Sequence, residues 1–100
     1  MSAYAIFEVR PNPDATDEQL RNYDEYKSQV PQLIEKFGGT YVIRGGSAVG
    51  LVGSQPAPRW HIIEFPDQEA AQSFWNSAEY KAIKHLRDGA AEVRAVVITA

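Results

Sequence analysis

The stretch YVIRGGSAVGLVGSQPAPRWHIIEF (Tyr41–Phe65) decides the fold of this 100-residue chain. Runs rich in β-branched and aromatic residues predict one strand over 40–44 and another over 59–65, with GSQPAP as a turn before the second. The run SAVGLV (47–52) predicts a continuation of the first strand after a bulge or bend at Gly45 and Gly46. The stretch as a whole is therefore predicted to be a long hairpin.

A phosphate-binding loop is the alternative interpretation of these glycines. Such a loop places its glycines between a strand and the start of a helix, and often follows them with Lys and then Ser or Thr. Here a strand follows the glycines and no such pair comes after them. We therefore favour the bulge.

The segment before the hairpin predicts a helix. Thr16 and Gln19 have the spacing of a capping box, and apolar residues then recur at helical spacing as far as Phe37. The Gly38-Gly39 pair predicts its end. Pro31 removes a backbone donor inside this run and predicts a kink or restart there.

The remaining segments complete the order of elements. AYAIFEV (3–9) and EVRAVVI (92–98) predict the first and last strands. Asp67 is a predicted N-cap after the hairpin, and Ser77 predicts a fresh helix that ends near Gly89. The order β-α-β-β-α-β is typical of an α+β, ferredoxin-like fold, with a four-stranded antiparallel sheet and helices on one face.

Composition narrows the class of protein. A chain of 100 residues and 11.1 kDa predicts one domain over residues 1–100. The net charge of −3 and the scattered basic residues argue against a nucleic-acid partner. The absence of cysteine excludes disulfides, thiol nucleophiles and zinc–thiolate sites. No signal-peptide pattern and no membrane-length apolar run are present, so we expect a cytoplasmic protein with no membrane partner.

Several residues and motifs carry a resemblance to a known group. They are Tyr23, Tyr26, FGGTYVIRGG (37–46), IIEFPDQEAAQSFWNSAEY (62–80) and Arg87. With the order of elements, they resemble the dimeric α+β barrel superfamily, and within it a bacterial family of similarly short proteins described as a domain of unknown function. Antibiotic-biosynthesis monooxygenases that need no cofactor and stress-responsive barrel proteins are related to it. The resemblance implies a homodimer whose two sheets face each other.

Alternation along the strands agrees with such a dimer. Ile6 and Ile62 point away from the side that bears Phe7 and Ile63, so both faces of the sheet are apolar. Helices cover only one face, and leaving the other in water costs about 25 cal/mol per Å² of apolar area. A second copy related by a two-fold axis removes that cost. Trp60 is compatible with either layer.

Two glutamates are candidate catalytic groups. If the first and third strands are parallel neighbours, aligning IFEV with IIEF puts Glu8 beside Glu64 on one face. Close carboxylates raise one pKa, which suits general acid or base work. Arg44 is a candidate counter-charge, or a clamp for an anionic substrate. The alternative is that both glutamates lie near water at the strand ends or in salt bridges of the dimer.

His61 is the third catalytic candidate, because its intrinsic pKa suits proton transfer near neutrality. Alternation places His61 and Glu64 on opposite faces, so they form no dyad. The alternative for His61 is a partly buried residue bonded to a tyrosine or a backbone carbonyl. His85 is expected on the surface, and the spacing of histidines and glutamates gives no support for a metal site.

Aromatic residues predict a pocket between helices and sheet. Tyr23, Tyr41 and Trp60 are, with Arg44, the candidate substrate-binding residues. Superfamily enzymes place a small-molecule pocket there, and no cofactor is expected. One hypothesis is an enzyme that transforms a small metabolite without an organic cofactor. The other is a non-catalytic dimer that binds a ligand or acts in stress physiology.

Overall fold

The computed structural model describes residues 2–100, and its order of elements confirms the predicted α+β, ferredoxin-like fold. The elements are β1 (Ala3–Pro11), α1 (Asp17–Lys36), β2 (Thr40–Gly46), β3 (Arg59–Phe65), α2 (Gln68–Trp75), α3 (Ala78–Ile83), the 3₁₀ helix η1 (Lys84–Arg87) and β4 (Ala91–Thr99). In this part of the chain no helix is both long and apolar enough to cross a membrane.

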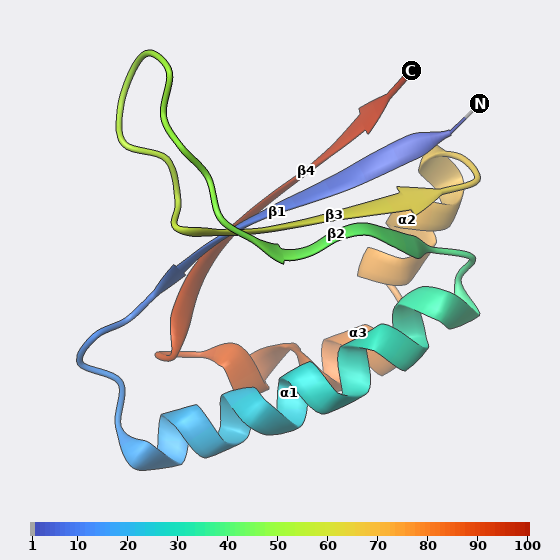
Figure 1. The fold of residues 1–100 in the computed structure, drawn as a ribbon. Helices are drawn as coiled ribbons and strands as arrows, with labels where there is room; N and C mark the ends of the chain where they lie inside the picture. Colours follow the sequence, from blue (N-terminus) through green and yellow to red (C-terminus); the bar gives the residue numbers. More distant parts are fainter. Residues whose placement is uncertain (1) are drawn as a thin grey trace.

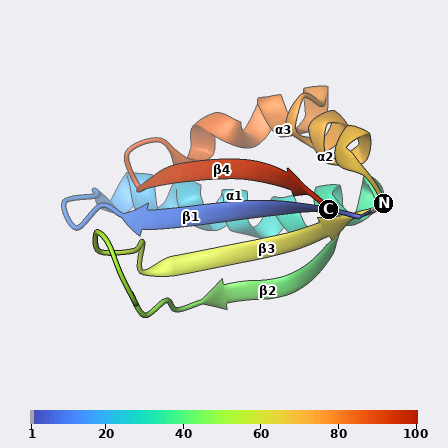
Figure 2. The ribbon, with the colours of Figure 1, turned by 90° about the horizontal axis from the view of Figure 1, so that it is seen from above.

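The four strands form one antiparallel sheet in the order β2-β3-β1-β4. The prediction that the first and third strands run parallel is wrong, because β1 pairs with β3 antiparallel. The crossover through α1 places β2 parallel to β1, with room for one strand between them. β3 follows β2, occupies this position and is therefore antiparallel to both β2 and β1. Figure 2 shows this order from above.

The helices all cover one face of the sheet (Figure 1). Alternate residues of β1, namely Ala3, Ala5 and Val9, are buried on that face. The core between the layers contains fully buried aromatic side chains, including Phe74 and Tyr80. A cavity between the two layers is therefore bounded on one side by the helix-covered face of the sheet.

α1 begins as its sequence predicts. The Thr16 hydroxyl oxygen accepts from the Gln19 backbone N–H at 3.1 Å, and the Gln19 side-chain oxygen accepts from the Thr16 N–H at 2.8 Å. The predicted restart at Pro31 is wrong, because α1 runs through it without interruption. Val30 and Ile34, on either side of it, both pack against the core, and the alternative of a kink at Pro31 stays a prediction.

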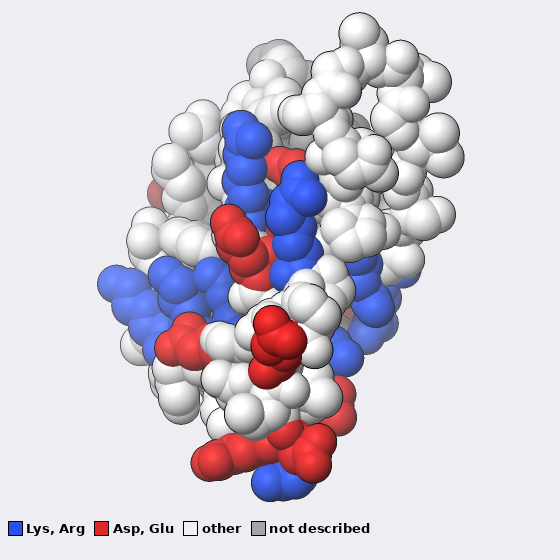
Figure 3. All heavy atoms as spheres, turned by 90° about the vertical axis from the view of Figure 1, so that its left-hand side faces the viewer, with Lys and Arg blue, Asp and Glu red and all other residues white. Residues whose placement is uncertain are grey.

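The predicted continuation of the second strand over 47–52 is also wrong. β2 ends at Gly46, and residues 47–58 form a projecting loop. β3 begins only at Arg59, after two prolines without N–H donors, so no strand is available to pair with this segment. In Figure 1 the loop stands on the side of the sheet opposite the helices, and in Figure 3 it carries no charged side chain. Leu51 and Val52 are 96% and 95% exposed.

The face of the sheet that carries no helix is largely apolar, and we call it the open face. Its residues follow from the register of the central strands: Tyr4, Ile6, Glu8, Trp60, Ile62, Glu64, Arg94, Val96 and Ile98. Trp60 belongs to this layer, since it lies opposite Glu8 in the β1–β3 register. Its indole N–H donates to the Ala57 carbonyl at 2.8 Å.

Candidate functional site

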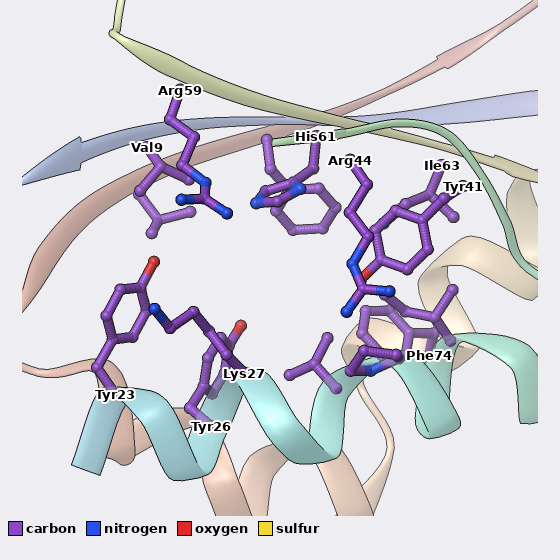
Figure 4. A pocket seen from close by; sticks show the side chains of 15 residues that line it. Val9, Tyr23, Tyr26, Lys27, Tyr41, Arg44, Arg59, His61, Ile63 and Phe74 are labelled. Atoms are coloured by element: carbon purple, nitrogen blue, oxygen red, sulfur yellow. The ribbon is translucent and has the colours of Figure 1, made fainter. Parts of the chain in front are cut away.

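A cavity of about 100 Å³ lies between α1 and the sheet (Figure 4). Its floor is apolar, with Phe7, Val9 and Ile63 contributed by the central strands. These side chains share the helix-covered face because β1 and β3 alternate with matched register, Phe7 lying opposite His61. The combination of an apolar floor with a few polar groups is the usual make-up of a small-molecule site.

Positive charge is concentrated at this cavity. Lys27 of α1, Arg44 of β2 and Arg59 of β3 all line it, whereas no Asp or Glu does. The Lys27 ammonium is also paired with the Asp24 carboxylate of the same helix at 3.3 Å, so the two arginines carry most of the positive charge of the site. Figure 4 shows the three side chains reaching into the space from the helix and from the sheet. The chain as a whole carries a net charge of −3. The cavity is thus a local cationic site in an acidic protein, and it attracts anions.

Two of the cations are held over tyrosine rings. The Arg44 guanidinium carbon lies 5.0 Å from the centroid of Tyr41, and the Lys27 ammonium lies 4.7 Å from the centroid of Tyr23. Cation–π contacts of this kind restrict long side chains. They leave each charge on the wall of the cavity with a limited range of positions.

His61 lies among these cations as a neutral group. Burial, followed by the charges of Arg59 and Arg44, lowers the pKa of its imidazole from 6.5. Its Nδ1 accepts a hydrogen bond of 3.0 Å from the Gly45 backbone N–H. A neutral imidazole whose Nδ1 accepts must carry its proton on Nε2. His61 is therefore arranged as a hydrogen-bond donor through Nε2, and neither predicted partner, a tyrosine or a backbone carbonyl, holds it.

Gly45 makes this contact possible. Its φ of +73° is a conformation that glycine adopts without strain. A Cβ atom at this position would lie 3.0 Å from Nη2 of Arg59. The glycine that sequence reasoning assigned to a bulge thus has a second effect, since it directs an amide at His61 and leaves room for Arg59.

The tyrosines of the cavity are neutral donors. Burial raises the pKa of Tyr23, Tyr26 and Tyr41. The Tyr26 hydroxyl also lies 2.8 Å from the hydroxyl of Tyr80, a fully buried residue of α3. Figure 4 shows the hydroxyl of Tyr26 directed from α1 into the cavity.

The structure does not bring the two candidate glutamates together. Both lie on the open face, but Glu8 pairs in register with Trp60, and Glu64 with Tyr4, four residues farther along the strand. Glu8 contacts Arg94 at 3.6 Å. Glu64 accepts a hydrogen bond of 3.2 Å from the Tyr4 hydroxyl. Parallel alignment would have made them neighbours, and the antiparallel register separates them.

Of the other predicted site residues, His61, Arg44, Tyr41 and Tyr23 line one cavity, and Trp60 lies on the opposite face of the sheet. Arg44 pairs with His61 in the β2–β3 register and lines the cavity. It therefore lies across the sheet from the two glutamates and is not their counter-charge. His85 is exposed, as expected. Within residues 2–100 no group of three His, Cys, Asp or Glu residues could hold a metal ion.

Sequence reasoning missed three residues of the cavity. Lys27 follows Tyr23 at i+4 spacing, which places both on one face of α1. Arg59 alternates with His61 and shares its face. Tyr26 belongs to the aromatic residues that predicted a pocket, but it was not among the candidate site residues. The signal for Lys27 and Arg59 was therefore present in the spacing.

Fold and site together define a ferredoxin-like α+β protein with a cationic cavity under its sheet. The chain belongs to the family described as Domain of unknown function (DUF1330), which matches residues 2–100. This confirms the resemblance inferred from the sequence. No match is found among curated proteins.

Solved structures share the fold. The RPA0582 protein of unknown function from Rhodopseudomonas palustris is 20% identical, with a TM-score of 0.77 over 99% of this chain and 82% of that one. A dimeric ferredoxin-like protein of unknown function from Jannaschia sp. CCS1 is 10% identical, with a TM-score of 0.67 over 100% of both chains. SnoaB, a cofactor-independent oxygenase from Streptomyces nogalater, is 10% identical, with a TM-score of 0.56 over 99% of this chain and 90% of that one.

Proposed function

We propose that this protein binds a small organic anion, a carboxylate with an apolar or aromatic body, in the cavity between α1 and the sheet. The observation that carries the proposal is the lining: Arg44 and Arg59, with the Asp24-paired Lys27 beside them, and no carboxylate among the lining residues above an apolar floor. Arginine binds carboxylates bidentately, and a water-poor site strengthens the attraction. The apolar floor accommodates the rest of the ligand.

The polar groups of the cavity favour recognition over base catalysis. His61 offers a proton on Nε2, because Nδ1 is occupied by the Gly45 amide. The tyrosines stay protonated and also offer hydrogens. A ring of donors and cations binds oxygen atoms that carry negative charge. We accordingly assign His61 as an orienting donor, with Arg44 as the anion clamp.

Binding is tested with a panel of carboxylates, namely benzoate, phenylacetate, cinnamate and octanoate, each compared with its neutral amide by titration calorimetry. We expect at least one carboxylate to bind at least tenfold more tightly than its amide, and R44Q to weaken it at least tenfold. R21Q is the matched control, since it removes the same charge from an exposed position of α1. Equal binding of acids and amides, or no binding of any acid, overturns the proposal.

We also infer that the open face pairs with a second copy of the chain. Ile98 and Val96 are 53% and 41% exposed, and Ile43 of β2, which pairs in register with Ile62 of this face, is 41% exposed. The face is therefore apolar yet uncovered in one chain. The charges of Glu8 and Arg94 on the face are already paired with each other. The uncharged loop 47–58 stands on the same side. Similar proteins from three organisms are described as dimeric, which supports a second copy as the partner.

A further inference from the structure

Three residues from separate elements form a chain of hydrogen bonds beneath the cavity. Nη1 of Arg87, in η1, lies 3.2 Å from the hydroxyl oxygen of Tyr80 in α3. That oxygen lies 2.8 Å from the hydroxyl oxygen of Tyr26 in α1. Tyr26 lines the cavity, whereas Tyr80 has no exposed surface. The chain therefore runs from an arginine outside the cavity to a hydroxyl at its edge.

The direction of these hydrogen bonds follows from what each group can do. A guanidinium only donates, so Tyr80 accepts from Arg87. The Tyr80 hydroxyl must also donate its own hydrogen to an acceptor, because a buried hydroxyl that donates no hydrogen bond destabilises the fold. Among residues 2–100, the only acceptor within hydrogen-bond distance of it is the Tyr26 oxygen. Tyr80 therefore donates to Tyr26, and the hydrogen of Tyr26 must point elsewhere.

Packing fixes the first two members of the chain. The Tyr80 ring lies between Phe74 and Trp75, with centroid distances of 4.9 and 5.1 Å. The Ser77 hydroxyl oxygen caps α3 by accepting from the Tyr80 backbone N–H at 3.1 Å. The Arg87 guanidinium lies 5.7 Å from the Trp75 ring centroid. The burial of Tyr80 and the contact of Arg87 with Trp75 restrict the positions of both side chains.

We propose that Arg87 and Tyr80 direct the hydroxyl hydrogen of Tyr26 into the cavity, so that Tyr26 donates it to an oxygen of the bound anion. The inference rests on the anion-binding function proposed above and deepens it. Tyr26 is a ligand-binding residue, and Tyr80 and Arg87 are positioning residues that act through it. The ligand must accordingly present a hydrogen-bond acceptor above Tyr26 as well as negative charge toward Arg44 and Lys27.

The direction of the hydrogen can be measured without any ligand. Protein with ¹³C at the ζ carbon of tyrosine is dissolved in equal parts of H₂O and D₂O, where a slowly exchanging hydroxyl splits its ¹³C signal in two. Y26F and Y80F assign the signals. We expect a split signal for Tyr80, whose hydrogen is buried in a hydrogen bond, and a single signal for Tyr26. A split signal for Tyr26, or a single one for Tyr80, overturns the proposed direction.

The role in binding is measured by a double-mutant cycle with the tightest carboxylate of the panel. Y26F is expected to weaken binding roughly ten- to a hundredfold, as for loss of a hydrogen bond to a charged group. Y80F is expected to weaken it several-fold in the wild-type background and not at all in Y26F. R87M should resemble Y80F, and R87K should restore part of the affinity. Equal losses from Y80F in both backgrounds would show that Tyr80 only supports packing, and would overturn its positioning role.

The two proposals fail in different ways. Absence of carboxylate binding by the wild type overturns the anion function and Tyr26 as its donor, while the isotope pattern still decides the direction of the hydrogen. Carboxylate binding that is unaffected by Y26F overturns only the role of Tyr26. Near-ultraviolet circular dichroism of each variant separates loss of binding from loss of fold.

Discussion

The backbone N–H of Gly45 donates to Nδ1 of His61 at 3.0 Å, from β2 to the facing strand β3. This bond fixes the tautomer of a neutral imidazole that lies between Arg44 and Arg59. It links the glycine-rich end of β2 to the cavity, at the point where the β2–β3 register shifts between Arg44 and Gly46. The consequences can be tested at both ends of the bond.

The first prediction concerns Gly45. We expect G45A to lower the free energy of unfolding by about 1–2 kcal/mol, because a Cβ is disfavoured at positive φ. We also expect a several-fold loss of carboxylate affinity, since that Cβ crowds Arg59. G53A is the matched control: Gly53 has a φ of +90° but no atom near its Cβ position. Denaturant unfolding and calorimetric titration measure the two effects, and weaker binding in both variants would contradict the assignment to Arg59.

The second prediction concerns pH and His61. Its pKa in the folded protein lies below 6.5, so between the two pKa values the unfolded chain binds more protons. Stability from this residue is therefore fully present above pH 6.5 and is lost as pH falls through the folded pKa. We expect H61Q to flatten the pH dependence of stability below 6.5, measured by denaturant unfolding.

H85Q is the control for that measurement, because it removes the other histidine, which is exposed and does not line the cavity. Anion binding should raise the pKa of His61, because negative charge beside the imidazole favours its protonated form. Proton uptake on carboxylate binding near pH 6 is the expected signature in calorimetry with buffers of different ionisation enthalpy. Proton release would contradict the arrangement.

The third prediction concerns the glutamates. E8Q and E64Q should change carboxylate affinity by less than about twofold, because both side chains lie across the sheet from the cavity and neither lines it. R44Q, measured in the same experiment, should weaken carboxylate binding at least tenfold. A tenfold effect of either glutamate variant would place it in the binding site, against the observed register.

The fourth prediction concerns the open face. I98E should convert a dimer of twice the 11.1 kDa chain mass into monomer, because it buries an unpaired charge in the proposed interface. L20E is the matched control, since Leu20 is 46% exposed and Ile98 53%, but Leu20 belongs to α1, which covers the other face of the sheet. Sedimentation equilibrium distinguishes the masses. Dimers for both variants, or a monomeric wild type, would contradict dimerisation through the open face.

The residues by themselves determined the order of helices and strands and the faces of the strands, although not where the second strand ends. Alternation along Arg59–Phe65 placed His61 away from Glu64, and the capping box at Thr16 marked the start of α1. Both signals are local, because they depend on backbone geometry within a few residues. The register between strands is not local. Whether Glu8 meets Glu64 or Trp60 depends on the direction in which distant strands pair.

Only the tertiary structure decided what the cavity contains. Lys27, Arg44 and Arg59 come from three elements, and the crossover through α1 brings them to one space. The same packing places Arg87 and Tyr80 beneath Tyr26, although more than 50 residues separate the two tyrosines along the chain. Spacing determines which face of a strand or helix a side chain occupies. The packing of layers decides which faces meet, and therefore which charges and hydroxyls act together.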